Sequence, residues 1–335
     1  MKIAVDGMGG DYAPEDVVTA CVNGSREYGV EIALVGPQER MEAELAKHDL
    51  SGTSIEIVHA AQHLVEGENP AYALRTKRDA SIVVATKLVR DGKADAVISA
   101  GPTGGVMAAA LYFLGTVEGM SRPVVGGPFL GFAPKTIMMD LGSNVDCQPY
   151  QLVDFAVVGA VYAGKLLGIE NPTVALLSVG AEEGKGNEQV KETYQLLKES
   201  GLNFIGNVEG YDIPTGKANV VICDGFVGNV IVKFTEALGQ TIGDWLVAEL
   251  KGKLPEAEIT DMVGRLVLAT NLADLGGGGP LWAVNGVVCV THGRSRAPEL
   301  AKTIGQAKTA VEEDLVGALT RELAAARGRS GQSDS

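Results

Sequence analysis

The sequence predicts an α/β fold in which a doubly wound, mostly parallel sheet carries helices on both faces. Short β-branched apolar runs alternate with amphipathic stretches of helical period, and most of the runs end in Gly or Asp. Apolar strands separated by helices are typical of parallel sheets that are buried on both faces. At 335 residues the chain is long enough to bury a large core.

Nine runs have the composition of strands. In chain order they are KIAVDG, EIALVG, SIEIVHA, ADAVISAG, KTIMMDLG, TVALLSVG, NFIGNVEG, ANVVICDG and NGVVCVTHG. Helical patterns lie between most of them, and seven run directly into turns that contain Gly or Asp. Ligands bind beyond the carboxyl ends of strands in open parallel sheets, so these turns are the candidate sites.

No Pro-, Ser- or Gly-rich linker divides the chain, so we expect one domain over residues 1–325. A lobe is expected at about 235–280, where two apolar helical stripes predict a protruding helical hairpin followed by four glycines. The small and polar segment 326–335 predicts a disordered tail.

Composition disfavours several classes of function. The net charge of −14 argues against a nucleic-acid partner, and it means that an acidic protein partner would need a local basic patch. The four isolated cysteines suggest neither a zinc site nor a redox pair, which fits a reducing cytoplasm. Asp6 interrupts the first apolar run too early for a signal peptide, and no run is long enough to span a bilayer.

The most informative motif is SVGAEEGKGNE, which follows a strand and precedes a helix. A Gly-rich turn at a helix N-terminus offers free backbone amides and the positive end of the helix dipole, and here a lysine is added. Phosphate is the expected ligand of such a site. The candidate residues are Gly184, Lys185, Gly186 and Asn187. The spacing is not that of a P-loop, and an ordinary helix-start loop is the alternative.

A second motif is CDGFVGN, in which Asp224 ends a strand and Gly225 follows it. Asn229 lies a short turn into the next helix, where its amide could donate a hydrogen bond to a developing oxyanion. Capping of that helix is the alternative role.

A third motif is SAGPTGG, in which Thr103 and Gly104 open a small-residue helix. Its first amides could cradle an anion or a carbonyl oxygen, although close helix packing would also explain the glycines. Further candidates for binding phosphate or substrate follow other strands: Asp6, Gly9, Gly10, Asn144 and His292. GMGGD lacks the dinucleotide spacing, so a role for NAD has weak support.

Several catalytic signatures are missing. There is no G-x-S-x-G elbow and no H-E-x-x-H motif, and the sequence has only four histidines, so hydrolysis by a catalytic triad is disfavoured. His292 could line a site, but a single His beside Gly is more often a packed structural residue.

The ordered set of motifs closely resembles the phosphate acyltransferase family over nearly the whole chain. The motifs are MKIAVDGMGGDYAP, SAGPTGG, DLGSNVDCQP, SVGAEEGKGNE, NVEGYDIPTG, CDGFVGNV, GGGGPLWAVNG and THG. The resemblance implies a homodimeric α/β/α sandwich similar to phosphotransacetylases and to isocitrate- and isopropylmalate-type dehydrogenases, with no metal or nucleotide cofactor.

The resemblance also implies an activity. A long-chain fatty acyl group would pass from acyl carrier protein to inorganic phosphate, and an acyl-phosphate:glycerol-3-phosphate acyltransferase would use the product for phospholipid synthesis. Lys185 and Asn229 stand at the positions that the family uses in catalysis. Phosphate is itself a nucleophile, so the lack of a triad fits. The family is cytoplasmic and contacts the inner face of the cell membrane through a hairpin like that at 235–280.

That hairpin could serve the dimer, the membrane or both, and Lys251, Lys253 and Arg265 could give the basic patch that an acidic carrier requires. The chain departs from the family pattern at Pro102, Tyr211, Arg294 and Arg296, where Asn, Arg and two small residues are usual. These departures leave the acyl donor open. The alternatives are a short-chain phosphotransacetylase that uses coenzyme A and a non-catalytic acyl- or carrier-binding module.

Overall fold

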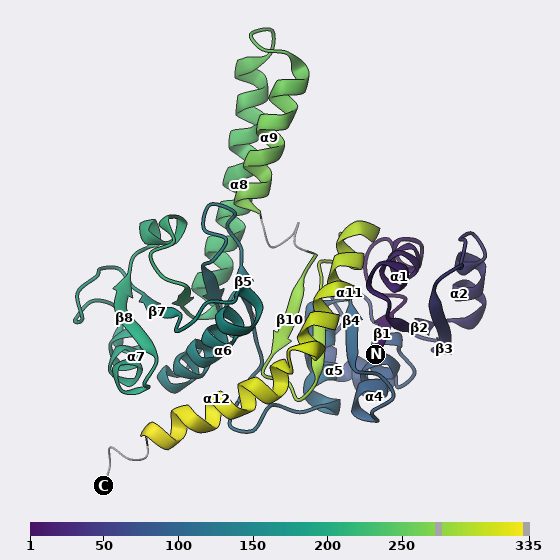
Figure 1. Ribbon diagram of the computed structural model, residues 1–335, viewed down its shortest axis with the longest axis horizontal. Coiled ribbons are helices and arrows are strands. Elements are labelled where there is room, and N and C mark those ends of the chain that lie inside the picture. The colour runs from purple at the N-terminus through teal and green to yellow at the C-terminus, as the bar shows by residue number, and fades with distance from the viewer. Residues whose placement is uncertain (272–276, 331–335) are drawn as a thin grey trace. The chain divides into compact units, whose positions relative to one another are not determined.

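The computed structural model describes residues 1–271 and 277–330 (Figure 1). Contacts within the chain divide it into two compact units, Met1–Pro123 with Gly276–Thr320 and Val124–Leu275 with Arg321–Ser335. We call them unit 1 and unit 2 and describe each by itself. The expectation of a single domain over 1–325 stays a prediction.

Unit 1 contains six neighbouring strands. Their order is β3 (Ser54–His59), β2 (Glu31–Gly36), β1 (Lys2–Asp6), β4 (Ala96–Ser99), β11 (Val287–Val290) and β10 (Gly279–Trp282). The first five are parallel, and β10 runs antiparallel to β11. The carboxyl ends of β1, β4 and β11 therefore lie side by side.

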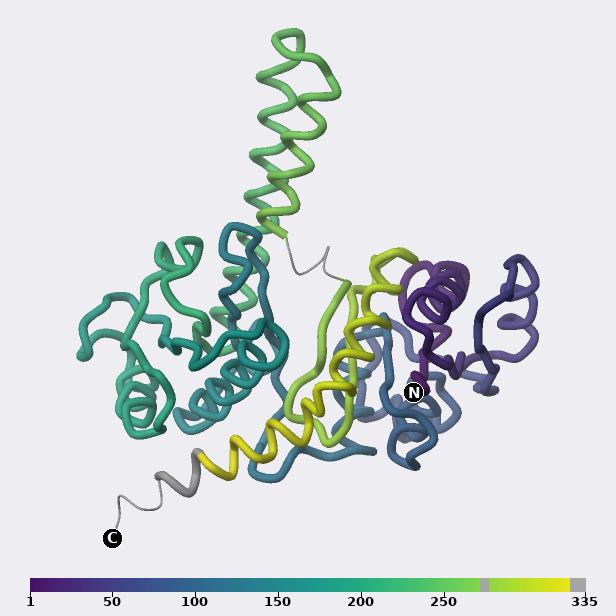
Figure 2. Tube along the Cα trace, viewed as in Figure 1, coloured from purple at the N-terminus to yellow at the C-terminus, as the bar shows by residue number. Residues whose placement is uncertain are grey.

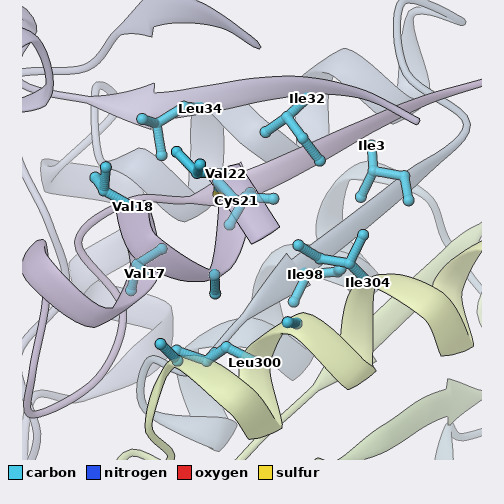
Figure 3. Close-up of a cluster of buried hydrophobic side chains, with 14 of the residues drawn as sticks. Ile3, Val17, Val18, Cys21, Val22, Ile32, Leu34, Ile98, Leu300 and Ile304 are labelled. Carbon is cyan, nitrogen blue, oxygen red and sulfur yellow. The ribbon is translucent and has the colours of Figure 1, made fainter. Parts of the chain in front are cut away.

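Helices cover both faces of this sheet (Figure 1). One layer holds α1 (Glu15–Tyr28), α2 (Gln38–Leu45) and α11 (Ala297–Glu312), and the other holds α3 (Pro70–Thr76), α4 (Ser81–Arg90) and α5 (Thr103–Phe113). Figure 3 shows the buried cluster between the first layer and the sheet, with Ile3 and Ile32 on the sheet and Leu300 on α11. The helices α1 and α11 approach closely because Gly24 has no side chain; a Cβ there would lie 3.2 Å from Ile304 Cβ.

Unit 2 contains five neighbouring strands. Their order is β5 (Val124–Pro128), β6 (Ile137–Met139), β9 (Val220–Ile222), β7 (Thr173–Leu177) and β8 (Asn203–Val208). The last four are parallel, and β5 runs antiparallel to β6. The helices α6 (Pro149–Leu167) and α7 (Glu188–Glu199) pack on the strands, as does the start of α8 (Gly225–Leu250), while the 3-10 helix η1 (Gly210–Thr215) follows β8.

The helices α8 and α9 (Glu256–Thr270) form the expected hairpin, and the trace turns back at its free end (Figure 2). The long helix starts at Gly225, ten residues before the expected lobe, because Asp224 caps it directly after β9. The rest of the expected lobe includes residues 272–276, which lie outside the described residues. The helix α12 (Leu315–Ser330) continues into the expected disordered tail, and 331–335 also lie outside the described residues.

The α/β prediction is confirmed, and all nine predicted strands are present. The two additional strands, β5 and β10, are short and antiparallel to their neighbours. Among the described residues, α6 is the helix that is long and apolar enough to cross a membrane, but 56% of its most apolar stretch is buried in the protein. It therefore has the character of a core helix.

Candidate active site

In unit 1, the turns after β1, β4 and β11 meet at one edge of the sheet. Asp6 lies at their centre: Ser99 Oγ donates to Asp6 Oδ2 at 2.7 Å, and Met8 N donates to Oδ1 at 3.3 Å. Gly101 N donates to Ser99 Oγ at 3.0 Å, which joins the second turn to the first. Burial raises the pKa of Asp6. The Asp6 side chain thus organises these turns from inside the protein.

Glycines permit this close approach of backbone. A Cβ on Gly9 would lie 2.7 Å from Gly101 N, and Gly10 has a φ of +101°, which side chains rarely tolerate. Asp11 N donates to Gly293 O at 2.8 Å, which connects the turn after β1 to the turn after β11. His292, in that turn, is half-buried.

Thr103 and Gly104 form the exposed start of α5. The helix begins after Pro102, which offers no side-chain cap to its first amides. Thr103 and Gly104 are exposed at this edge of unit 1, as are Asp11 and Arg294 in the neighbouring turns.

In unit 2, the turns after β6, β9 and β7 line one edge in adjacent positions, because these three strands are parallel neighbours. Gln189 Nε2, at the start of α7, donates to Cys147 O at 2.6 Å, which links the segment after β7 to the segment after β6. The three motifs DLGSNVD, CDGFVGN and SVGAEEGKGNE are therefore brought together.

Asp140 organises the turn after β6 and is fully buried. Its carboxylate accepts hydrogen bonds from Gly142 N, Ser143 N and Asn144 N at 2.7 to 2.9 Å, and from both of the Ser143 and Asn144 side chains. Asn144 thus faces inward, and its carbonyl accepts from Gly225 N at 2.8 Å. Sequence reasoning overlooked Asp140 and Ser143, although a strand-ending Asp followed by small polar residues could have indicated them.

Asn229 lies exposed on α8 beside this turn. A Cβ on Gly142 would lie 3.3 Å from Asn229 Oδ1, so the glycine leaves room for the amide. The cap of α8 is Asp224, whose Oδ1 accepts from Val227 N at 2.8 Å. The Asn229 amide is therefore not used as a cap, and it can donate to a ligand.

Lys185 lies exposed in the turn after β7. Within the described residues its ammonium makes no ion pair. Its own amide donates to Glu182 O at 3.0 Å, and Asn207 Nδ2, from β8, donates to the same carbonyl at 2.9 Å. Asn207 is 5% exposed and was not identified from the sequence, because its partner is 25 residues away. It holds the turn that carries Lys185.

The rest of this turn is fixed by its glycines and by a helix cap. Gly186 has a φ of +104°, and a Cβ on Gly180 would lie 2.8 Å from Lys185 Cγ. Asn187 caps α7 by accepting from Val190 N at 2.9 Å, while Gly184 is exposed. The edge of unit 2 thus offers an ammonium, an amide donor and the starts of two helices, a set that stabilises negative charge.

Several basic residues that the sequence singled out form ion pairs within the chain. Arg296 donates to Asp16 Oδ2 at 3.0 Å, and its guanidinium lies 3.2 Å from the centre of the Tyr12 ring. Arg296, where a small residue is usual in the family, therefore makes contacts within the chain. On the hairpin, Lys253 pairs with Glu249 and Arg265 pairs with Asp261. The expected basic patch there is therefore largely neutralised.

Comparison with known proteins places the chain in a family. A family model described as fatty acid synthesis protein matches residues 1–317. A phosphate acyltransferase of Desulforamulus reducens is 43% identical, covering 96% of this chain and 97% of that protein. One of Moorella thermoacetica is 44% identical, with 95% of each chain covered.

Solved structures with the same fold include a phosphotransacetylase from Streptococcus pyogenes. Its TM-score is 0.63 at 19% identity, over 93% of this chain and 94% of that one. A phosphotransacetylase from Staphylococcus aureus has a TM-score of 0.57 at 19% identity, over 92% and 94%. These likenesses show the α/β fold, and the sequence matches show that the chain belongs to the fatty acid synthesis protein family, with relatives named phosphate acyltransferase.

Proposed function

We propose that this chain is an enzyme that transfers a long-chain fatty acyl group from acyl carrier protein to inorganic phosphate. The names of its relatives support acyl transfer to phosphate. The observation that carries the proposal is the edge of unit 2, where Lys185 is exposed on one turn and Asn229 is exposed on α8 beside another, and buried residues hold both turns in place. A cation and a neutral donor are what an anionic nucleophile and an oxyanion require.

The reaction needs no enzyme nucleophile. A phosphate oxygen attacks the thioester carbon, a C–O bond forms, and the carbonyl oxygen becomes an oxyanion. The C–S bond then breaks, and the carrier's thiolate leaves and takes up a proton. Lys185 holds the phosphate as a point charge. Asn229 Nδ2 donates to the oxyanion, an effect worth about 3 to 4 kcal/mol.

The other candidate residues have several roles. Thr103 and Gly104 in unit 1, and Gly184 and Gly186 in unit 2, offer exposed or partly exposed backbone for phosphate or the acyl carbonyl. Asp6, Asn144, Asn187 and Asp224 hold the turns by internal hydrogen bonds. Gly9, Gly10 and Gly225 permit close backbone approach, and His292 is a further contact. The mechanism requires no metal or nucleotide.

The same proposal covers assembly and location. We expect a cytoplasmic homodimer that contacts the inner membrane surface and passes acyl-phosphate to an acyl-phosphate:glycerol-3-phosphate acyltransferase. Its support is the hairpin, where Phe234 and Trp245 are 65% and 60% exposed. Exposed aromatic residues of this kind mark a protein or membrane contact.

The test is turnover of palmitoyl acyl carrier protein with and without phosphate, for the native chain and for Lys185→Ala and Asn229→Ala. We expect phosphate-dependent release of free carrier that falls about 100-fold or more in Asn229→Ala. Lys191→Ala, an exposed lysine on α7, is the matched control and should retain activity.

Release of free carrier at the same rate with and without phosphate would overturn the proposal. Preference for acetyl-coenzyme A would indicate the short-chain phosphotransacetylase instead. Binding of acyl carrier without turnover by the native chain would indicate a non-catalytic module.

A further inference from the structure

A basic surface stands out on this acidic chain. Residues 70–93 hold six basic side chains and two acidic ones, a local net charge of +4, whereas the whole chain has −14. The segment includes α3 and α4, which lie in unit 1 and belong to none of the turns described above. We call the face formed by α3, α4 and α5 the basic face.

Contacts join these helices into one surface. Both α3 and α4 pack on α5. Lys87 Nζ and the Arg90 guanidinium lie 5.3 and 5.8 Å from the centre of the Phe113 ring of α5. Lys87 Nζ also donates to Arg78 O at 3.2 Å, which connects α4 to the segment after α3. Two of the positive charges, those of Lys87 and Arg90, therefore lie around the Phe113 ring.

Few acidic side chains neutralise this face. Lys77 pairs with Glu68 at 2.5 Å, and Arg90 pairs with Asp91 at 2.7 Å. Arg75 and Arg78 are exposed and form no ion pair within residues 1–271 and 277–330. On the hairpin, by contrast, Lys253 and Arg265 each have an acidic partner one turn away.

The basic face adjoins a candidate substrate contact. Pro70 begins α3, and a Cβ on Gly104 would lie 3.3 Å from Pro70 Cγ. The start of α5, with Thr103 and Gly104, thus meets the start of α3. Tyr72 and Tyr112 are 69% and 76% exposed on the same two helices, so the face combines positive charge with large apolar side chains.

We infer that the basic face is the docking surface for the acidic carrier protein, and that the carrier's acyl-bearing arm passes Thr103 and Gly104. This inference rests on the proposed function, which supplies the carrier as acyl donor. Opposite local charge steers association and fixes orientation, whereas the rest of the chain is strongly acidic and would repel the same partner. Exposed tyrosines provide the apolar contact that a helical partner needs.

The experiment compares two donors. Arg75→Glu/Arg78→Glu reverses charge on the face, and Arg40→Glu/Lys47→Glu makes the same change of charge on and beside α2. Each variant and the native chain receive palmitoyl acyl carrier protein or palmitoyl-pantetheine, which lacks the protein. We expect kcat/KM for the carrier to fall about tenfold or more in the first variant only, with palmitoyl-pantetheine unaffected. The fall should shrink at about 0.5 M salt.

Arg75→Lys/Arg78→Lys should retain carrier turnover, because it keeps the charge. An equal loss with both donors, or no loss with either, would overturn the docking surface while leaving the proposed reaction intact. Should the native chain lack phosphate-dependent turnover, the proposed function fails. Fluorescence anisotropy of labelled acyl carrier then still decides the docking surface: weaker binding to Arg75→Glu/Arg78→Glu supports it, and unchanged binding overturns it.

Discussion

At the scale of residues, the candidate site separates into buried organisers and exposed contacts. Asp140, Asn207 and Asp6 are at most 5% exposed and hold turns through hydrogen bonds. Lys185 is exposed on one of these turns, and Asn229 is exposed on α8 beside the turn of Asp140. Substitution of a buried organiser should therefore shift the position of Lys185 or Asn229. Substitution of Lys185 or Asn229 should remove a group that contacts the substrate.

The first prediction concerns Asn207, which fixes the Glu182 carbonyl and so the turn of Lys185. We expect Asn207→Ala to raise KM for phosphate about tenfold, with a smaller fall in kcat, because a displaced ammonium binds phosphate less well. Steady-state kinetics with varied phosphate measures this split.

Asn203→Ala is the control, since Asn203 lies on the same strand and its amide also donates to a carbonyl, that of Asn171, at 3.0 Å. Equal effects of the two substitutions would show that Asn207 acts through general stability and not through Lys185.

The second prediction concerns the pH dependence of stability. Burial raises the pKa of Asp6, so the folded chain keeps this proton to a higher pH than the unfolded chain does. The associated stability is fully present below the unfolded pKa of about 4 and is lost as pH rises through the folded pKa. Asp6→Asn should therefore gain stability relative to the native chain as pH rises from about 4 toward neutrality.

Urea unfolding at several pH values measures the difference. Asp212→Asn should show the opposite trend, because hydrogen bonds from Glu209 N and Lys217 lower the pKa of Asp212 and stabilise the ionised form. A flat difference between Asp6→Asn and the native chain would show that Asp6 does not titrate as its burial implies.

The sequence identified the turns better than the roles within them. Asn187 and Asp224 were expected to bind substrate, and the structure shows both as helix caps. A short polar residue after a strand can either cap or bind, and only its partners decide between the two. Asn207 was missed because its hydrogen bond joins segments that sequence patterns do not connect.

At the scale of elements, α8 links the candidate chemistry to the hairpin. It runs from Gly225, beside Asn229, to Leu250 at the hairpin turn. Glycines set its packing at two levels: a Cβ on Gly228 would overlap the Asp140 carbonyl, and one on Gly239 would overlap the Thr270 side chain. The helix therefore approaches the Asp140 turn at its start and α9 at mid-length.

The third prediction uses two glycines of this hairpin. Gly239→Ala should destabilise the chain by about 1 to 3 kcal/mol, since the added methyl would force α8 away from α9. Gly264→Ala on α9 meets no atom within 4 Å and should stabilise the chain by about 0.5 to 1 kcal/mol through helix propensity. Chemical unfolding measures both, and effects of the same sign would contradict close packing at Gly239.

Strand prediction succeeded where a run is rich in apolar and β-branched residues, including the partly exposed β3 and β8. The two strands that it missed, β5 with VVGGP and β10 with GPLW, contain Gly and Pro and are typical of turns by composition. Each becomes a strand through antiparallel pairing with a neighbour, β6 or β11. Such pairing is a tertiary effect that local composition does not encode.

At the scale of the whole molecule, two surfaces of the described residues are candidates for contact with a partner. One is the basic face, with Arg75 and Arg78. The other is the exposed apolar side of the hairpin, with Phe234, Leu238 and Trp245 at 65%, 43% and 60% exposure. The sequence predicted an apolar stripe on the hairpin, but it did not predict that close packing at Gly239 and Gly243 would leave these larger side chains uncovered.

The fourth prediction concerns what the exposed apolar side of the hairpin binds. Trp245→Asp places a charge among the exposed side chains, so it should weaken both dimerisation and binding to phospholipid vesicles if the two hairpins pack together and present a shared apolar tip. Gln240→Asp adds the same charge at an exposed position on another face of α8 and is the control. Sedimentation velocity reports the dimer, and flotation with vesicles reports the membrane.

The two measurements separate the possible partners. Loss of the dimer with retained flotation would make the apolar side a protein interface, and the reverse would make it a membrane contact. Turnover of soluble acyl carrier should persist in both variants, because Asn229 lies at the other end of α8, next to the turn of Asp140. Loss of turnover in Trp245→Asp alone would instead show that the hairpin's partner is needed to complete the site.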